Sequence, residues 1–237
     1  YEPLLMGVQA CMWTEFCNTP EDVFYLTFPR LGALAEIAWV SKGTKNWNSF
    51  LKGLDNYNAH LACKGIRYAH SMFNIQHKIT TETTGKLKVK LECERPDVEI
   101  RYTTDGTEPT ATSTLYEKEL IIEKDTDIKA ATFSQNKQMG ELLVLPIHWN
   151  KATSKPFIHA DAGMDILVNG LRGSLKYTDF EWYTGQLSKP VSFTIDLQKP
   201  ESMKQFTVGC ITNYGMGVHK PRSLKAVSYT HLRAHET

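Results

Sequence analysis

The chain has 237 residues, a formal net charge of +1 and a hydrophobic fraction of 41%. A length of this order accommodates roughly one to three domains, and the composition is ordinary for globular protein. The near-neutral charge argues against a nucleic-acid partner, and no apolar run reaches the length of a membrane span. The five cysteines are scattered and odd in number, which predicts neither a disulfide framework nor a zinc site. No cofactor or metal is expected.

Residues 7–15 (GVQACMWTE) form a short apolar run that ends in Trp13 and Glu15. Such a run predicts a buried parallel strand, and functional side chains of α/β barrels lie at the C-terminal ends of their strands. A tryptophan two residues before a glutamate offers a flat apolar face beside a hydrogen-bond acceptor, which are the two features that a pyranose ring needs. From composition alone, Trp13 would be a core aromatic and Glu15 a surface charge.

Three helices are predicted after this run. Residues 19–22 (TPED) provide a threonine N-cap, a proline at N1 and two first-turn acids, which fit a helix start better than a catalytic acid pair. A second helix is predicted over residues 28–39, with Arg30 in a structural salt bridge. Apolar residues at helical spacing predict a third helix over residues 46–64, which ends at Gly65.

After these helices, the residue pattern becomes typical of strands. A connection is predicted over residues 68–77, followed by a strand-rich region over residues 79–149. Apolar and charged residues alternate over residues 86–92 and 98–102, which is typical of strands with one buried and one solvent-facing side. Further strands are predicted over residues 120–122 and 127–133.

The run 7–15, the helical stretch 19–39 and the segment 47–68 together resemble the C-terminal end of the family 20 glycoside hydrolases, the β-N-acetylhexosaminidases. The resemblance implies that residues 1–70 are the C-terminal β/α end of a TIM (β/α)8 barrel. It also implies that the catalytic Asp-Glu pair lies upstream, outside this chain, and that the acetamido group of the substrate attacks the anomeric carbon. Trp13 would then form a wall of the sugar pocket, and Glu15 would accept hydrogen bonds from the sugar hydroxyls.

Residues 102–133 resemble the small immunoglobulin-like module at the C-terminus of chitobiases, which implies a domain over residues 76–149. The expected fold class is therefore multidomain, with the barrel end followed by two all-β sandwich modules.

The second of these modules rests on a resemblance of residues 167–170, Trp182 and residues 191–197 to the start of a galactose-binding-like (factor 5/8 type C) domain over residues 153–225. Residues 206–211 would be a later core strand. Modules of this kind bind glycans through loop aromatics, but a core role for Trp182 is at least as well supported, so no binding residue is assigned. The aromatic candidates in this module are Trp182, Tyr183 and Tyr214.

Residues 226–237 stand apart from the rest, because the run 227–237 (VSYTHLRAHET) resembles the translation of a sequencing adapter. We expect it to be an artefact, so the i, i+4 pair His231 and His235 carries no metal prediction. With no initiator methionine at Tyr1, the chain is expected to be a fragment.

The sequence thus predicts a fragment of an exo-β-N-acetylhexosaminidase that hydrolyses terminal N-acetylhexosamine from glycans by substrate-assisted, retaining catalysis. The partner would be a glycan with terminal GlcNAc or GalNAc. A secreted, periplasmic or cell-surface location follows only by family analogy. The alternative is a non-catalytic glycan-binding or adhesion protein built on an inactive barrel, which the two downstream sandwich modules favour.

Overall fold

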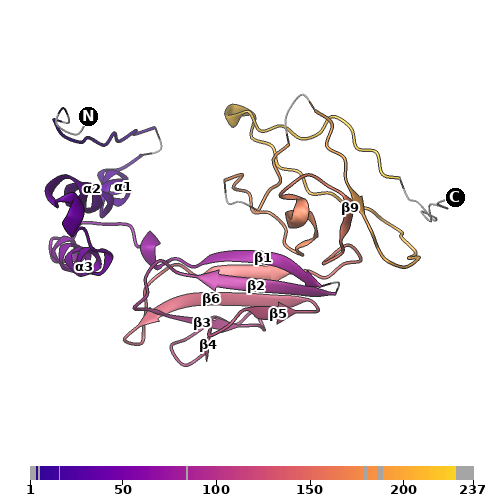
Figure 1. Ribbon diagram of the computed structural model, residues 1–237, viewed down its shortest axis with the longest axis horizontal. Helices are drawn as coiled ribbons and strands as arrows, with labels where there is room; N and C mark the ends of the chain where they lie inside the picture. Colours follow the sequence, from indigo (N-terminus) through magenta and orange to yellow (C-terminus); the bar gives the residue numbers. More distant parts are fainter. Residues whose placement is uncertain are drawn as a thin grey trace. The chain divides into compact units, whose positions relative to one another are not determined.

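The computed structural model describes residue 4 and residues 6–15, 17–83, 85–178, 181–185 and 189–227. The chain divides into two compact units, Tyr1–Met72 and Phe73–Thr237, and each is described by itself (Figure 1). Within the described residues, no helix combines the length and the apolar character needed to cross a membrane.

The first unit is helical, and all three predicted helices are present. The second helix begins two residues later than expected, because Phe28 is extended and Pro29 occupies the N-cap position. The helices are α1 (Pro20–Thr27), α2 (Arg30–Trp39) and α3 (Trp47–Cys63), with a short 3-10 helix, η2 (Lys42–Thr44), between α2 and α3.

Helix α3 carries most of the buried surface of the first unit. The Asn46 side chain caps its start by accepting a hydrogen bond from the Ser49 amide at 3.0 Å. Gly65 follows its end at φ +66°, a conformation that favours glycine. The apolar residues at helical spacing that predicted this helix are Phe50, Leu54, Tyr57 and Leu61; Leu54 and Leu61 are buried, and the other two are half-buried. The buried side chains of α3 are Leu51, Leu54, Asn58 and Leu61.

The predicted strand over residues 7–15 is wrong for this chain. Residues 6–14 have no regular secondary structure, and Val8, Met12 and Trp13 are exposed. A strand requires a ladder of backbone partners, and no described residue pairs with this run.

The second unit contains an antiparallel sandwich of two sheets, drawn as two layers in Figure 1. One sheet has the strand order β1-β2-β5, and the other has the order β4-β3-β6-β7 with β8 also paired to β6. The predicted strands are confirmed. The strands are β1 (Gln76–Thr83), β2 (Lys86–Glu92), β3 (Glu99–Thr103), β4 (Thr114–Leu115), β5 (Leu120–Ile122), β6 (Thr126–Ser134), β7 (Lys137–Gln138) and β8 (Leu143–Ile147).

The sandwich core lies between the two sheets. The alternation of β2 places Leu87, Val89 and Leu91 inside and its charged residues outside, as predicted. They share one buried apolar cluster with residues of β6 and β8, including Ile128 and Ile147. On the outer face, lysines of β2 form ion pairs with Glu82 of β1 and with Glu119 and Glu123, which flank β5. These exposed ion pairs keep this face solvated and add little stability.

The predicted connection over residues 68–77 is shorter than expected, because β1 already begins at Gln76. A 3-10 helix, η3 (Ser71–Phe73), precedes it, and Phe73 is buried. The Thr132 hydroxyl donates to the Phe73 carbonyl at 2.7 Å and accepts from the Gly140 amide at 3.0 Å. A Cβ on Gly140 would lie 2.3 Å from that carbonyl oxygen, so this position has room only for glycine.

The described residues between 150 and 227 contain little regular structure. Strands β9 (Phe157–His159) and β10 (Thr194–Ile195) pair with each other, so only part of the predicted strand over residues 191–197 forms. The predicted core strand over residues 206–211 is wrong, since these residues are irregular and the Phe206 side chain is 50% exposed. The remaining elements are the 3-10 helices η4 (Met164–Val168), which includes part of the predicted 167–170 landmark, and η5 (Tyr214–Met216). The pair His231 and His235 lies outside the described residues.

The buried Thr132 hydroxyl generates a stability prediction. Thr132→Val should lower the free energy of unfolding by about 1–3 kcal/mol, because it removes two buried hydrogen bonds, one to the Phe73 carbonyl and one from the Gly140 amide. Urea unfolding followed by circular dichroism would measure this change. Thr114→Val on the exposed strand β4 is the control and should change stability by less than about 0.5 kcal/mol. Equal effects of the two substitutions would contradict the role given to Thr132.

Candidate functional site

Trp13 and Glu15 lie in the irregular segment directly before α1. The Trp13 side chain is 74% exposed, and Glu15 is exposed at a turn. The Cys17 amide donates to the Thr14 carbonyl at 3.0 Å, which turns the chain toward the helix. Neither Trp13 nor Glu15 makes a hydrogen bond or an ion pair with another described residue, so both are accessible to a ligand.

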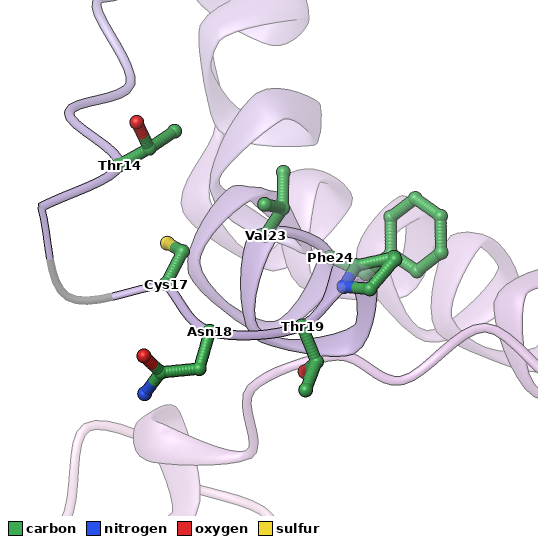
Figure 2. Close-up of a pocket in the computed structure, with 7 residues that line it drawn as sticks. Thr14, Cys17, Asn18, Thr19, Val23 and Phe24 are labelled. Atoms are coloured by element: carbon green, nitrogen blue, oxygen red, sulfur yellow. The ribbon is translucent and has the colours of Figure 1, made fainter.

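A shallow hollow of about 400 Å³ adjoins this segment. In Figure 2, Thr14 and Cys17 lie on the chain that precedes α1, while Val23 and Phe24 lie on the helix itself. The sequence pattern had singled out neither Cys17 nor Asn18, which also lines the hollow. Their position depends on the turn at Thr14 and carries no signature of its own in the sequence.

The start of α1 is fixed by a reciprocal capping arrangement. The Thr19 side chain accepts from the Asp22 amide at 3.3 Å, and the Asp22 carboxylate accepts from the Thr19 amide at 3.0 Å and the Asn18 amide at 3.1 Å. Hydrogen bonds from the Thr19 side chain and from these two amides hold the pKa of Asp22 below its usual value. A general acid needs a raised pKa, so Asp22 serves the helix start and not proton transfer, as predicted.

Two arginines bind the ends of α1. Arg67 lies 3.7 Å from the Asp22 carboxylate and 4.8 Å above the Tyr25 ring. The Arg30 guanidinium donates to the carbonyls of Tyr25 and Leu26 at 3.1 and 3.0 Å. The prediction of a salt bridge for Arg30 is therefore wrong. Its guanidinium binds backbone carbonyls instead, because the carbonyls of the last helical turn have no acceptor role within the helix and lie within its reach.

The aromatic candidates of residues 153–225 differ in how they are engaged. The Trp182 indole donates to the Ser174 carbonyl at 3.0 Å, and its ring lies against Gly173. The Tyr183 hydroxyl donates to the Asp161 carboxylate at 3.4 Å. Tyr214 is 65% exposed on η5.

A second hollow, of about 370 Å³, lies in the sandwich beside Asp105, Asp125 and Asp127. The Asp105 carboxylate accepts from the Thr107 amide and hydroxyl, which lowers its pKa, and the Asp125 carboxylate accepts from the Trp149 amide. Asp105 thus shapes a turn and Asp125 holds the backbone at Trp149. No group of potential metal ligands gathers among the described residues.

Comparison with known families finds matches for two parts of the chain. Residues 2–42 match the catalytic domain of glycosyl hydrolase family 20, and residues 80–143 match the chitobiase/beta-hexosaminidase C-terminal domain. Residues 2–42 are thus similar to part of a family 20 glycosyl hydrolase catalytic domain. The first match includes Trp13 and Glu15, and the second falls within strands β1 to β8 of the sandwich.

The curated relatives carry the corresponding names. The chain is similar to a beta-hexosaminidase of Porphyromonas gingivalis, with 31% identity over 65% of this chain and 19% of that protein. It is also similar to the beta-hexosaminidase subunit alpha of Rattus norvegicus, with 38% identity over 27% of this chain and 12% of the relative. A beta-N-acetylhexosaminidase of Cellulomonas fimi is 35% identical over 19% of this chain and 9% of its own length. The chain thus spans about a fifth or less of these relatives.

The capping arrangement at α1 predicts a pH dependence. Because the pKa of Asp22 is lowered in the folded chain, its ionised form stabilises the helix start at pH values above about 4, and this stabilisation is lost as the pH falls through the folded pKa. Thr19→Val should move the Asp22 pKa upward, toward its usual value, in a carboxyl NMR titration. Thr27→Val at the other end of α1 is the control. An Asp22 pKa that does not change in Thr19→Val would contradict the assignment.

Proposed function

We propose that this chain is a segment of an exo-β-N-acetylhexosaminidase and that Trp13 and Glu15 contact the terminal sugar of its glycan substrate. The observation that carries the proposal is an accessible tryptophan two residues from an accessible glutamate, directly before a capped helix and inside the family 20 match. A carbohydrate site requires an apolar ring face and a hydrogen-bond acceptor side by side.

In this proposal the two residues position the sugar and transfer no proton. Trp13 stacks against the ring or acetamido side of the terminal sugar, and Glu15 accepts hydrogen bonds from its distal hydroxyls. The acetamido oxygen of the substrate attacks the anomeric carbon, and an acid from an Asp-Glu pair elsewhere in the parent protein protonates the leaving oxygen. Terminal GlcNAc or GalNAc is the substrate class.

The exposed apolar residues of the first unit support a barrel end over residues 1–70. Leu31, Ile37 and Trp39 project from α2 into solvent, and Trp39 is 88% exposed. Large apolar side chains gathered on one short helix are usually covered by another surface. A barrel built from further β/α units would supply both this cover and the strand partners that residues 7–15 lack.

The other domain assignments are part of the same proposal. We assign residues 76–149 to an immunoglobulin-like module, residues 153–225 to a galactose-binding-like module and residues 226–237 to adapter-derived sequence. An exported parent protein, whether secreted, periplasmic or on the cell surface, is consistent with action on glycans.

The proposal predicts a selective kinetic defect. In the full-length parent enzyme, Trp13→Ala or Glu15→Gln should lower kcat/KM on an aryl N-acetyl-β-glucosaminide by about 30-fold or more, which corresponds to about 2 kcal/mol for a desolvated contact. Trp13→Phe should retain part of the activity, because it keeps an aromatic face. Glu21→Gln, at the neighbouring exposed acid, is the matched control and should behave as wild type. Wild-type kinetics in both Trp13→Ala and Glu15→Gln would refute the site.

A second candidate function is a non-catalytic glycan-binding or adhesion protein on an inactive barrel, which the extent of β structure after residue 75 favours. The full-length parent distinguishes the two. If it hydrolyses the aryl N-acetyl-β-glucosaminide, and mutation of the upstream Asp-Glu pair abolishes hydrolysis, the enzyme is supported. Glycan binding on an array without any hydrolysis would support the second candidate instead.

A further inference from the structure

We propose that residues 150–171 form a rigid joint that unfolds together with the sandwich as one cooperative unit. The sequence had suggested a separate module over residues 153–225, after a first module that ends at residue 149. A connection that lets modules move independently keeps its backbone in solvent and makes few contacts. Residues 150–171 do the opposite at three places, and a fourth contact lies just beyond them at Glu181; the four are described in turn.

The first place is the pair Thr153 and Ser154, both of which are fully buried. The Ser154 hydroxyl accepts a hydrogen bond from the amide of Gly85, between β1 and β2, at 2.8 Å. The Ser154 amide donates to the Val168 carbonyl at 2.9 Å, and the Asn150 amide donates to the Thr153 hydroxyl at 3.0 Å. Ser154 adopts φ +59°, a strained conformation for a residue with a side chain, which surrounding contacts must hold in place.

The second place is η4, which packs against β1. Its Met164 and Val168 side chains are almost completely buried. Leu171, just beyond the helix, and Trp149, just before the joint, pack against the apolar cluster of the sandwich. The core therefore continues from the sandwich into the joint without an intervening solvated layer.

The third place is Gly170. It adopts φ +80°, and its carbonyl accepts a hydrogen bond from the His148 amide at 2.9 Å. A Cβ at this position would lie 2.9 Å from the Ile147 side chain and 3.2 Å from the His148 carbonyl oxygen. The end of β8 and residue 170 thus touch backbone to backbone.

The fourth place is a hydrogen-bond contact between the side chains of His77 of β1 and Glu181. The His77 ring nitrogen Nε2 lies 2.5 Å from the Glu181 carboxylate, and the two side chains are only 19% and 14% exposed. This contact extends the joint beyond Leu171, because it ties a residue ten positions further along the chain to the same strand that η4 covers.

The test is hydrogen exchange of the full chain, measured by mass spectrometry at increasing urea concentration. Peptides that cover β2 and peptides that cover residues 154–171 should lose protection at the same urea concentration, because cooperative units open together. Loss of protection in residues 154–171 at a clearly lower urea concentration than in β2 would overturn the proposal.

Two glycines on either side of η4 provide a matched pair of variants. Gly163 and Gly170 both have positive φ, at +86° and +80°, but a Cβ on Gly163 would have no heavy atom within 4 Å. Gly163→Ala and Gly170→Ala therefore carry similar backbone strain, and only Gly170→Ala presses on the sandwich. We expect Gly170→Ala to accelerate exchange in both β8 and residues 154–171, by about tenfold or more relative to Gly163→Ala. Equal exchange in the two variants, or acceleration confined to residues 154–171, would overturn the proposal.

Discussion

Exclusion of water from between two sheets organises the larger unit of this protein. Leu87, Val89 and Leu91 of one sheet meet Ile128 and other residues of the opposite sheet in a single apolar cluster. The hydrogen-bonded register of every strand follows from this contact, because a shift by one residue would turn the charged side of β2 inward. Phe73, which precedes the first strand of the sandwich, and Leu171, the last residue of the joint, both contact structure that this core holds in place.

At the start of the chain, apolar residues are not buried from water in this way. Residues 6–14 have the apolar character of an interior strand and yet find no ladder partner among the described residues. Helix α2 likewise directs Leu31, Ile37 and Trp39 into solvent. Trp13 and Glu15 are thus accessible because the whole segment around them is exposed, and not only because they belong to a proposed sugar site. Capping at Thr19 fixes only the start of the helix that follows.

Local signals in the sequence were sufficient where the structure is local. The capping residues before α1 and the stop at Gly65 predicted what is found, since each depends on contacts a few residues apart. The alternation over residues 86–92 correctly predicted which side chains of β2 are buried. The strand over residues 7–15 and the core strand over residues 206–211 failed, because a strand exists only with partners that no local pattern encodes. The proposed sugar-binding roles of Trp13 and Glu15 rest on the family resemblance, because from composition alone Trp13 would be a core aromatic and Glu15 a surface charge. The role of Ser154 had no signal at all, as it depends on an amide 69 positions away.

The close approach at Gly170 has a practical consequence for exchanging modules between related proteins. The sequence suggests a boundary near Asn150. A recombination point there would remove the Ser154 hydroxyl, which accepts the hydrogen bond from the Gly85 amide, and would expose Ile147. A recombination point after Leu171 would keep the whole joint together with the sandwich. Glu181, the partner of His77, would still have to be replaced. A segment exchanged between related proteins must therefore be longer than the family match over residues 80–143.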